Sequence, residues 1–175
     1  DYDEKVRTTC SYCGVGCNLE ASVKDGKVVS IDTPKETEVN AGHTCVKGRY
    51  AFGFYDHPDR LRSPLIKRNG KFEKASWDEA YEYIKKKLEK IKKENGPDAI
   101  AGISSARCTN EENYVFQKMI RAVVGTNNID CCARICHSPT AWGMQQTFGT
   151  GAATNSTEDI YHADLFLVIG ANPTN

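Results

Sequence analysis

The chain has 175 residues, of which 39% are apolar, so it can bury a core as one domain or as two small ones. Lys and Arg together number 23, as do Asp and Glu, and the formal net charge of zero gives no support to a nucleic-acid partner or an anionic membrane surface. The longest apolar run, residues 165–169, is too short to span a bilayer.

Eight cysteines are many for a chain of this length. A secreted disulfide framework is one use of an even cysteine count. The sequence shows no signal peptide, however, and most of the thiols are clustered rather than spaced for loop closure. We therefore expect reduced, metal-ligating thiols and a cytoplasmic location. Because the chain starts at Asp1 and stops just after an expected strand, we interpret it as a piece of a longer polypeptide.

The most informative stretch is a turn-rich loop that holds Cys10, Cys13 and Cys17, with Cys45 following after a further 27 residues. Thiolates are soft ligands that suit an iron–sulfur cluster or zinc. Four-cysteine zinc sites usually come as two separated pairs, whereas a grouping of three plus one fits a cubane with one remote corner. The spacing favours a 4Fe–4S cluster, with zinc and four unrelated buried thiols as the alternatives.

Extended segments surround this loop. Strands are expected at residues 7–10, 19–24 and 27–31, with an Asp25-Gly26 hairpin turn between the last two. Residues 45–52 are expected to form a short helix that starts at the fourth cysteine. We predict that residues 1–55 are a small β-rich domain that needs its metal cluster as an internal staple.

A capping box, Ser76-Trp-Asp-Glu79, opens the clearest predicted helix, which follows a second hairpin turn at Asn69-Gly70. Apolar residues recur along it at helical spacing until Gly96 ends it. Its lysines fall opposite the apolar face and alternate with glutamates. This pattern indicates a solvated surface rather than a nucleic-acid site.

Strands and helices alternate through the rest of the chain. Strands are expected at residues 99–103, 128–130 and 165–169, the first and last of them buried, and helices after a second capping box at Thr109 and around Pro139. This order indicates the parallel sheet of a doubly wound α/β domain, whose ligands bind beyond the carboxyl ends of the strands. We predict that residues 56–175 are the start of such a domain, truncated at its C-terminus.

A second chemical motif surrounds Cys136 and His137. A cysteine at the mouth of a helix, beside a histidine and near Arg134, has the positive surroundings that favour a thiolate. Local residues leave three interpretations open. They are a cysteine nucleophile with histidine as its base, a buried cysteine beside a surface histidine, and a thiolate ligand to a catalytic metal with His137 transferring a proton.

Two longer blocks carry a family resemblance. The four-cysteine spacing with its continuation Cys45-Val-Lys47-Gly-Arg49 resembles the amino-terminal cluster domain of molybdopterin-dependent oxidoreductases. Residues 105–114 and 129–139 resemble formate dehydrogenase catalytic subunits in particular. The resemblance covers essentially all of the chain, and a whole catalytic subunit of this family is far longer.

The resemblance implies an enzyme that interconverts formate and carbon dioxide at a molybdenum or tungsten centre carried by bis-molybdopterin guanine dinucleotide. Its electrons leave through one 4Fe–4S cluster to a redox partner subunit or an electron carrier. The implied cluster ligands are Cys10, Cys13, Cys17 and Cys45.

The other implied roles are Cys136 as the Mo or W ligand, His137 as the proton-handling group, Lys47 on the electron route between cluster and pterin, and Arg107, Gly170 and Asn172 as pterin contacts. Because a bis-pterin needs the rest of the same catalytic chain, the 175 residues alone are expected to be inactive.

Two alternatives to a formate dehydrogenase remain. Another molybdopterin oxidoreductase, such as a nitrate reductase, is disfavoured by His137, since nitrate reductases that resemble this family usually carry Met after the cysteine. A non-catalytic Fe–S or zinc module is the alternative from a different class. Cys108, Cys131 and Cys132 are expected to be small buried hydrophobes without a chemical role.

Overall fold

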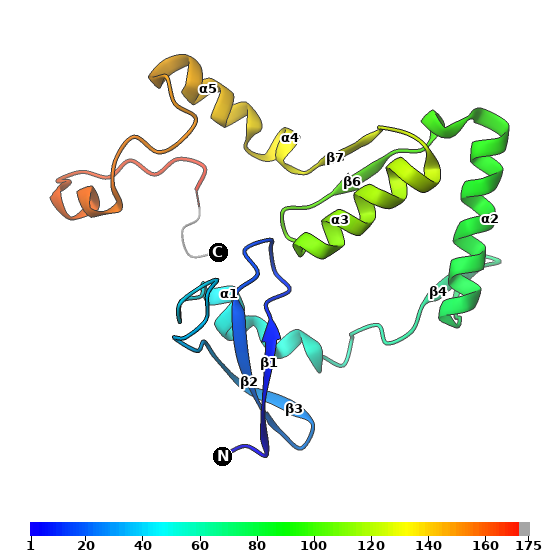
Figure 1. Cartoon of the computed structure of the whole chain (residues 1–175), viewed down its shortest axis with the longest axis horizontal. Helices are drawn as coiled ribbons and strands as arrows, with labels where there is room; N and C mark the ends of the chain where they lie inside the picture. Colours follow the sequence, from blue (N-terminus) through cyan, green and yellow to red (C-terminus); the bar gives the residue numbers. More distant parts are fainter. Residues whose placement is uncertain (172–175) are drawn as a thin grey trace. The chain divides into compact units, whose positions relative to one another are not determined.

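The computed structural model describes residues 1–171 of the chain, and its first elements form a three-stranded antiparallel sheet (Figure 1). The strands, in sheet order, are β1 (Glu4–Thr9), β2 (Asn18–Lys24) and β3 (Lys27–Asp32). Thr9 pairs with Asn18 at the end of the β1–β2 ladder. The sheet therefore holds together the two ends of the loop formed by residues 10–17.

Alternation along these strands places a small apolar core on one side of the sheet. The core consists of Cys10, Leu19, Ala21 and Ile31, and Phe52 packs against it. Phe52 comes from η1 (Ala51–Tyr55), a short 3₁₀ helix that continues α1 (Val46–Tyr50). The short helix predicted at the fourth cysteine is thus confirmed, and its continuation covers the sheet.

Both predicted hairpin turns are confirmed. Asp25 and Gly26 connect β2 to β3 with φ angles of 50° and 73°, and Asn69 and Gly70 have φ angles of 49° and 82°. Positive φ at both central residues is what a type I′ turn requires, and Asn, Asp and Gly tolerate it best. The second turn joins β4 (Leu65–Arg68) to β5 (Lys71–Lys74) in a separate two-stranded sheet.

Helix α2 (Trp77–Asn95) follows this hairpin and begins at the predicted capping box. The Ser76 hydroxyl accepts a hydrogen bond from the Glu79 backbone N–H at 3.1 Å, and the Glu79 carboxylate accepts one from the Ser76 N–H at 2.9 Å. Gly96 ends the helix with a φ of 83° and leads into η2 (Pro97–Ala99). The capping box thus satisfies two backbone donors at the start of the helix, the N–H groups of Ser76 and Glu79, that would otherwise be unpaired.

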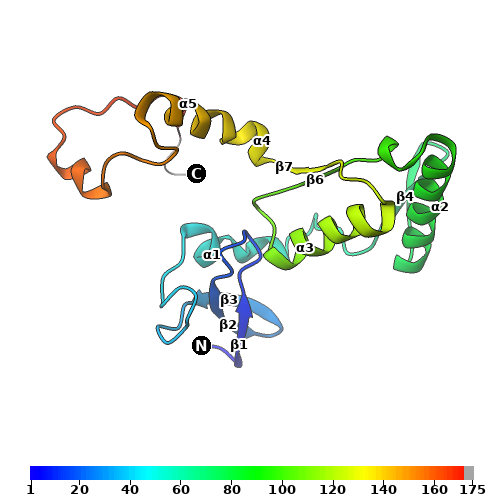
Figure 2. The ribbon, with the colours of Figure 1, turned by 45° about the horizontal axis from the view of Figure 1, so that its top comes forward.

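Two parallel strands, β6 (Gly102–Ser104) and β7 (Ile129–Cys131), are connected by α3 (Asn110–Lys118) and the π-helical turn η3 (Met119–Val124), as Figure 2 shows. A second core of Ile100, Ile120 and Val124 lies between these elements, and Leu88 of α2 packs against it. This βαβ arrangement, together with the β-rich first module, confirms the predicted α/β class.

The remaining elements are α4 (Ala133–Cys136), α5 (Ser138–Phe148) and η4 (Thr157–His162). Pro139 stands in the first turn of α5, as predicted, where its missing N–H costs no hydrogen bond. Gly149 ends α5 in the left-handed conformation. Cys136 and His137 therefore lie at the junction of two consecutive helices.

One strand prediction is wrong, and another is wrong in part. Residues 165–169 form no strand, and Leu165 and Leu167 are more than four-fifths exposed. A strand exists only through hydrogen bonds to a neighbour, and none of the described strands pairs with this segment. The first apolar strand begins at Gly102 rather than residue 99, and Ile103 is 79% exposed because the β6–β7 pair is packed on one face only.

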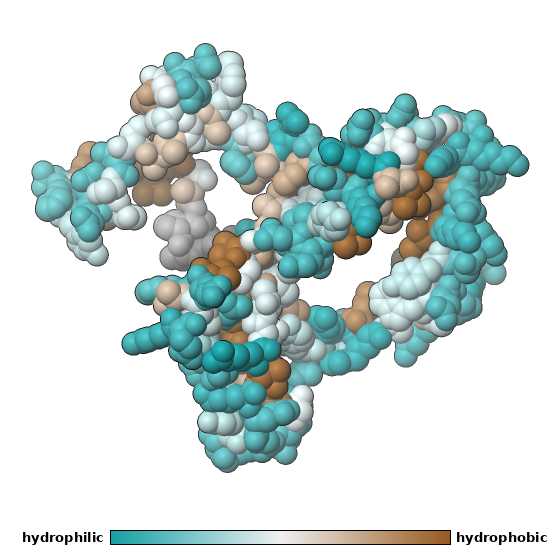
Figure 3. All heavy atoms as spheres, in the orientation of Figure 1, coloured by the Kyte–Doolittle hydropathy of each residue, from teal (hydrophilic) through white to brown (hydrophobic). Residues whose placement is uncertain are grey.

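The predicted apolar face of α2 is only partly used. Trp77 and Tyr81 are 62% and 59% exposed, and their rings pack on each other with centroids 5.6 Å apart. In Figure 3 brown, apolar side chains reach the surface beside α2. Only the part of the helix around Leu88 reaches the second core.

Contacts within the chain group its residues into two compact units, Asp1–Cys132 and a second that begins at Ala133. The boundary predicted at residue 55 stays a prediction. No helix among the described residues is both long enough and apolar enough to cross a membrane.

Replacing Gly102 with alanine is expected to destabilise the second core, because a Cβ there would lie 2.9 Å from Ile120 and 3.0 Å from Phe116. Overpacking of this kind costs about 1–3 kcal/mol in the free energy of unfolding. Urea denaturation followed by circular dichroism measures the loss. Gly143→Ala, in an open position of α5, is the matched control and should lose no stability. Equal losses in the two variants would contradict the tight packing at Gly102.

Candidate functional site

The loop that carries three of the cysteines is closed at its base and tied to η1. The Cys10 N–H donates to the Cys17 carbonyl at 2.8 Å, which extends the β1–β2 ladder by one bond. The Tyr12 hydroxyl donates to the Ala51 carbonyl at 2.7 Å. The left-handed φ of Gly16, 70°, turns the chain back toward β2. The loop therefore presents its thiols from a fixed backbone.

The fourth thiol belongs to Cys45, the N-cap residue of α1. The backbone N–H groups of Gly48 and Lys47 favour the charged form and lower the pKa of the Cys45 thiol, and the positive charge of Lys47 adds to the effect. Arg49 fixes the other side of the helix by donating from Nη2 to the Thr33 hydroxyl at 2.9 Å. The lowered pKa favours the thiolate form of Cys45.

Of the predicted cluster ligands, Cys10 is buried in the small core, and Cys17 packs against it. Burial raises the pKa of the Cys10 thiol, and the electrostatic influence of Cys17, Cys13 and Cys45 raises it further. Among the described residues, no three His, Cys, Asp or Glu side chains converge closely enough to hold one metal ion. Each thiolate of a 4Fe–4S cluster binds its own iron, so its ligands need to surround a volume rather than a point.

Gly48 provides the close approach between α1 and the loop. It is buried, and a Cβ at this position would lie 3.5 Å from the Cys10 sulfur and in contact with the Thr44 hydroxyl. The Thr44 Oγ1 is itself buried without a hydrogen-bond partner among the described residues. A hydroxyl donor beside Cys45 that lacks an acceptor in the protein is consistent with a sulfur-rich group in this place.

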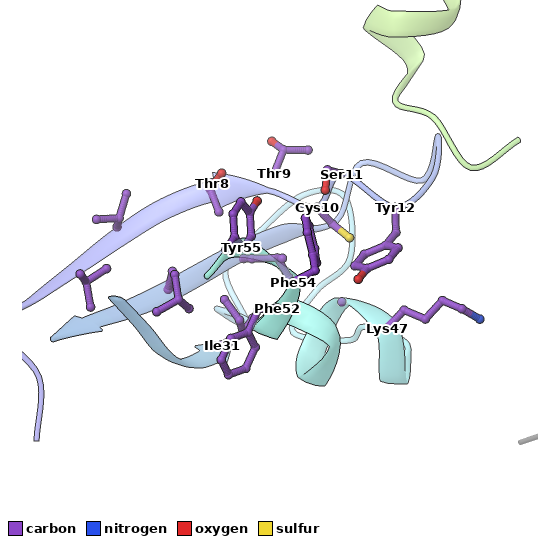
Figure 4. Close-up of a pocket in the computed structure, with 16 residues that line it drawn as sticks. Thr8, Thr9, Cys10, Ser11, Tyr12, Ile31, Lys47, Phe52, Phe54 and Tyr55 are labelled. Atoms are coloured by element: carbon purple, nitrogen blue, oxygen red, sulfur yellow. The ribbon is translucent and has the colours of Figure 1, made fainter. Parts of the chain in front are cut away.

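An apolar cavity of about 230 Å³ lies under the loop (Figure 4). Cys10 and Lys47 line its edge, whereas Phe52, Phe54 and Tyr55 come from η1. Of the four cluster cysteines, Cys10 alone lines it. Figure 4 shows the Lys47 side chain extending from α1 away from the aromatic side chains.

The predicted pterin contact Arg107 lies in the loop after β6, at the carboxyl edge of the parallel pair. This loop is held in two ways. The Asn113 amide donates to the Ser105 carbonyl at 3.2 Å, and the Ala106 N–H donates to the Cys132 sulfur at 3.2 Å. The Cys132 N–H also donates to the Ser104 carbonyl at 3.1 Å. The loop at the ligand-binding edge of the sheet is thus fixed both by α3 and by Cys132, which directly follows β7.

The expectation that Cys108, Cys131 and Cys132 are buried hydrophobes is wrong, because all three are only partly buried. The hydrogen bond from Ala106 lowers the pKa of the Cys132 thiol, with a further contribution from Cys131, whose sulfur is 4.0 Å away. Sequence reasoning missed Cys132, since a backbone donor from a loop 26 residues distant leaves no local signal.

Cys136 and His137 lie in the second unit. Cys136 is exposed and ends α4, and His137 directly precedes α5, where its carbonyl accepts the Ala141 N–H at 2.8 Å. Gly170 has a left-handed φ of 64°. Asn172 lies outside the described residues. The predicted cluster ligands and Lys47 therefore belong to the first unit, whereas Cys136 and His137 belong to the second.

Comparison with known protein families decides what this arrangement belongs to. Residues 3–57 match the molybdopterin oxidoreductase Fe4S4 domain, and residues 60–175 match the molybdopterin oxidoreductase family itself. The chain belongs to the molybdopterin oxidoreductases. Members of this family carry a 4Fe–4S cluster and a molybdopterin, so these are the cofactors of the chain.

Curated relatives of this molybdopterin oxidoreductase include two methanogen proteins. The chain is 50% identical over 167 residues to the F420-dependent formate dehydrogenase 1 subunit alpha of Methanococcus maripaludis, and 49% identical to the corresponding subunit of Methanocaldococcus jannaschii. Each match covers 95% of this chain and 24% of the relative. The chain therefore spans about a quarter of the length of these relatives.

Among solved structures, the acetylene hydratase of Pelobacter acetylenicus matches with a TM-score of 0.63 and 26% sequence identity. The match covers 81% of this chain and 20% of that protein. It supports the α/β fold, with a small β-rich amino-terminal region, for this member of the molybdopterin oxidoreductases.

Gly48→Ala is expected to lower the iron and sulfide bound per chain about twofold or more, because its methyl group would push Thr44 and the Cys10 sulfur away from their positions. Iron and acid-labile sulfide analysis after anaerobic reconstitution measures the effect. Gly53→Ala, five residues on and in open space, is the control and should bind as much iron as the parent chain. Undiminished iron in Gly48→Ala would contradict the packing of α1 on the loop.

In the cluster-free chain at neutral pH, Cys45 should react with iodoacetamide about tenfold or more faster than Cys10. Its lowered pKa leaves more thiolate at this pH and its side chain is exposed, whereas Cys10 is buried and its pKa is raised. Peptide mass spectrometry of timed samples gives both rates. In urea the two rates should become similar, and a faster Cys10 in the folded chain would refute the assignment.

Proposed function

We propose that this chain is part of the catalytic subunit of a formate dehydrogenase, which converts formate to carbon dioxide, a proton and two electrons, and can run in reverse. The observation that carries the proposal is the Cys136-His137 pair in a chain that is about half identical to formate dehydrogenase alpha subunits over 95% of its length. The rest of the same polypeptide is needed to complete the site.

The cofactors divide the chemistry between them. When bound, a molybdenum or tungsten bis-molybdopterin guanine dinucleotide accepts the two electrons of formate together, and the 4Fe–4S cluster passes them on singly. We assign Cys136 as the metal ligand. Its exposed position at the end of α4 leaves the sulfur accessible to a group supplied by the rest of the molecule.

His137 is the proposed acceptor of the proton released from formate. Its imidazole makes no capping hydrogen bond to α5, so the ring is not committed to holding the helix. Histidine changes its charge near neutral pH, which suits a group that must take up and release a proton in each turnover. Its place directly after Cys136 keeps the acceptor beside the metal ligand.

Lys47 is proposed to lie on the electron route between the cluster and the pterin. Its ammonium group already helps to lower the pKa of Cys45, which supports a position beside the thiolate ligands. The same charge offsets part of the negative charge of a cluster held by four thiolates. These two roles are compatible, since a cationic side chain can stabilise an anionic cluster and lie beside the pterin.

The pterin contacts are proposed at Arg107, Gly170 and Asn172. Arg107 follows β6 at the carboxyl edge of the parallel pair, where ligands of α/β sheets bind. A guanidinium group is suited to phosphate oxygens, which the dinucleotide part of the cofactor provides. Gly170 has a backbone conformation that favours glycine and allows close approach of a ligand.

The electron acceptor is proposed from the relatives. Two methanogen proteins half identical to this chain are named as F420-dependent, so we propose that the electrons reach F420 through a partner subunit. The reduced thiols favour a cytoplasmic location. A nitrate reductase is the rival within the family, and His137 in place of the Met usual there argues against it.

Cys136→Ser in the full-length enzyme is expected to lower the rate of formate oxidation roughly a thousandfold or more, because a serine hydroxyl is a poor replacement for a thiolate metal ligand. Formate-dependent reduction of a viologen dye measures the rate. The visible absorbance of the 4Fe–4S cluster should be unchanged. Cys108→Ser, in the same subunit, is the control and should retain activity.

Metal analysis of the same preparation separates the competing functions. Four irons, four sulfides and one molybdenum or tungsten per chain are expected for the full-length enzyme. Zinc alone would refute the proposal, and nitrate reduction without formate oxidation would support the rival enzyme. Full activity in Cys136→Ser would show that the metal ligand is another residue.

A further inference from the structure

The loop formed by residues 10–17, called the cluster loop below, accepts a hydrogen bond from a side chain of α3. The Asn110 Nδ2 donates to the Gly14 carbonyl at 2.8 Å, across 96 residues of sequence. Gly14 follows Cys13 directly. The contact is close enough that a Cβ on Gly14 would lie 2.7 Å from the Asn110 Oδ1. The amide of Asn110 therefore rests on the backbone between two proposed cluster ligands.

Asn110 is held in place because it is the first residue of a capped helix. The Thr109 hydroxyl accepts the Glu112 N–H at 3.2 Å, and the Glu112 carboxylate accepts the Thr109 N–H at 2.7 Å. A reciprocal capping box fixes the backbone at the start of a helix. The donor that meets Gly14 is thus preorganised by α3 and does not depend on the loop for its orientation.

The next turn of α3 holds the segment that carries Arg107. The Asn113 side-chain amide donates to the Ser105 carbonyl at 3.2 Å. Ala106, the residue after Ser105, donates its backbone N–H to the Cys132 sulfur. One face of the helix start therefore contacts the cluster loop through Asn110 and the proposed pterin-binding loop through Asn113. A displacement of the cluster relative to that loop must break one of these bonds.

We propose that Asn110 is a positioning residue, which holds the cluster loop against the proposed pterin-binding segment and thereby sets the reduction potential of the cluster. The inference rests on the proposed cluster ligands and adds a residue to which no role is assigned above. The potential of a 4Fe–4S cluster depends on local charge, hydrogen bonds and solvent exposure. The reduced cluster is more negative than the oxidised one. A neutral amide beside Gly14 therefore destabilises the reduced cluster less than a carboxylate in the same place would.

The test compares Asn110→Asp with Asn128→Asp in the full-length enzyme with its cofactors. Asn128 is a matched control, because its Nδ2 also donates to a backbone carbonyl, that of Asp98, at 2.9 Å. Its place at the amino-terminal end of β7 keeps it out of the cluster loop. The midpoint potential of the cluster is measured by an EPR-monitored titration with dithionite and mediators.

We expect Asn110→Asp to lower the equilibrium constant for one-electron reduction of the cluster about tenfold relative to the parent. This corresponds to a shift of the midpoint potential by ~59 mV to a more negative value. Asn128→Asp should leave the potential unchanged. Equal potentials in the two variants would overturn the proposal. The titration needs no formate, so it succeeds or fails independently of the activity that is proposed above.

Asn110→Leu gives a second measurement in case Asn110→Asp assembles no cluster. Leucine has a similar size but cannot donate to Gly14, so the loop loses its outer anchor. Loss of the cluster to a ferrous chelator, followed by its visible absorbance, should be about tenfold faster than in the parent. A rate no faster than that of Asn128→Leu would overturn the proposal.

Discussion

The burial of the Cys10 thiol in a small core beside Cys17 is the constraint on which the first unit depends. Burial raises the pKa of the Cys10 thiol, and the electrostatic influence of Cys17, Cys13 and Cys45 raises it further. A small sheet and a five-residue helix do not bury enough apolar surface to hold such a site without help. Backbone N–H groups at Cys45, the charge of Lys47 and a bound cluster together offset this cost.

Several residues with a proposed chemical or positioning role lie at the start of a helix. Cys45 is the N-cap of α1, Asn110 opens α3 after a capping box, and His137 precedes α5. Backbone donors at these places are fixed by the helix and do not need to be ordered when a ligand arrives. Loops that would be adaptable on their own are thereby tied to rigid elements.

Apolar surface remains exposed in the described part of this molybdopterin oxidoreductase. The chain spans about a quarter of its curated relatives, and Trp77, Tyr81 and residues 165–169 are largely uncovered. The pattern of residues 165–169 is that of a buried strand, but a strand cannot satisfy its backbone groups without a neighbour. The pattern of residues 165–169 predicts a paired, buried strand, but none of the described strands pairs with this segment.

The sequence by itself determined the features whose causes are local. Both hairpin turns depend on Asn, Asp and Gly at positive φ, and both capping boxes depend on side chains three residues apart. Only the tertiary structure decided which distant groups meet. The bonds from Asn110 to Gly14 and from Ala106 to Cys132 join segments 96 and 26 residues apart. Such pairs have no periodicity or motif, because they arise from the packing of whole elements.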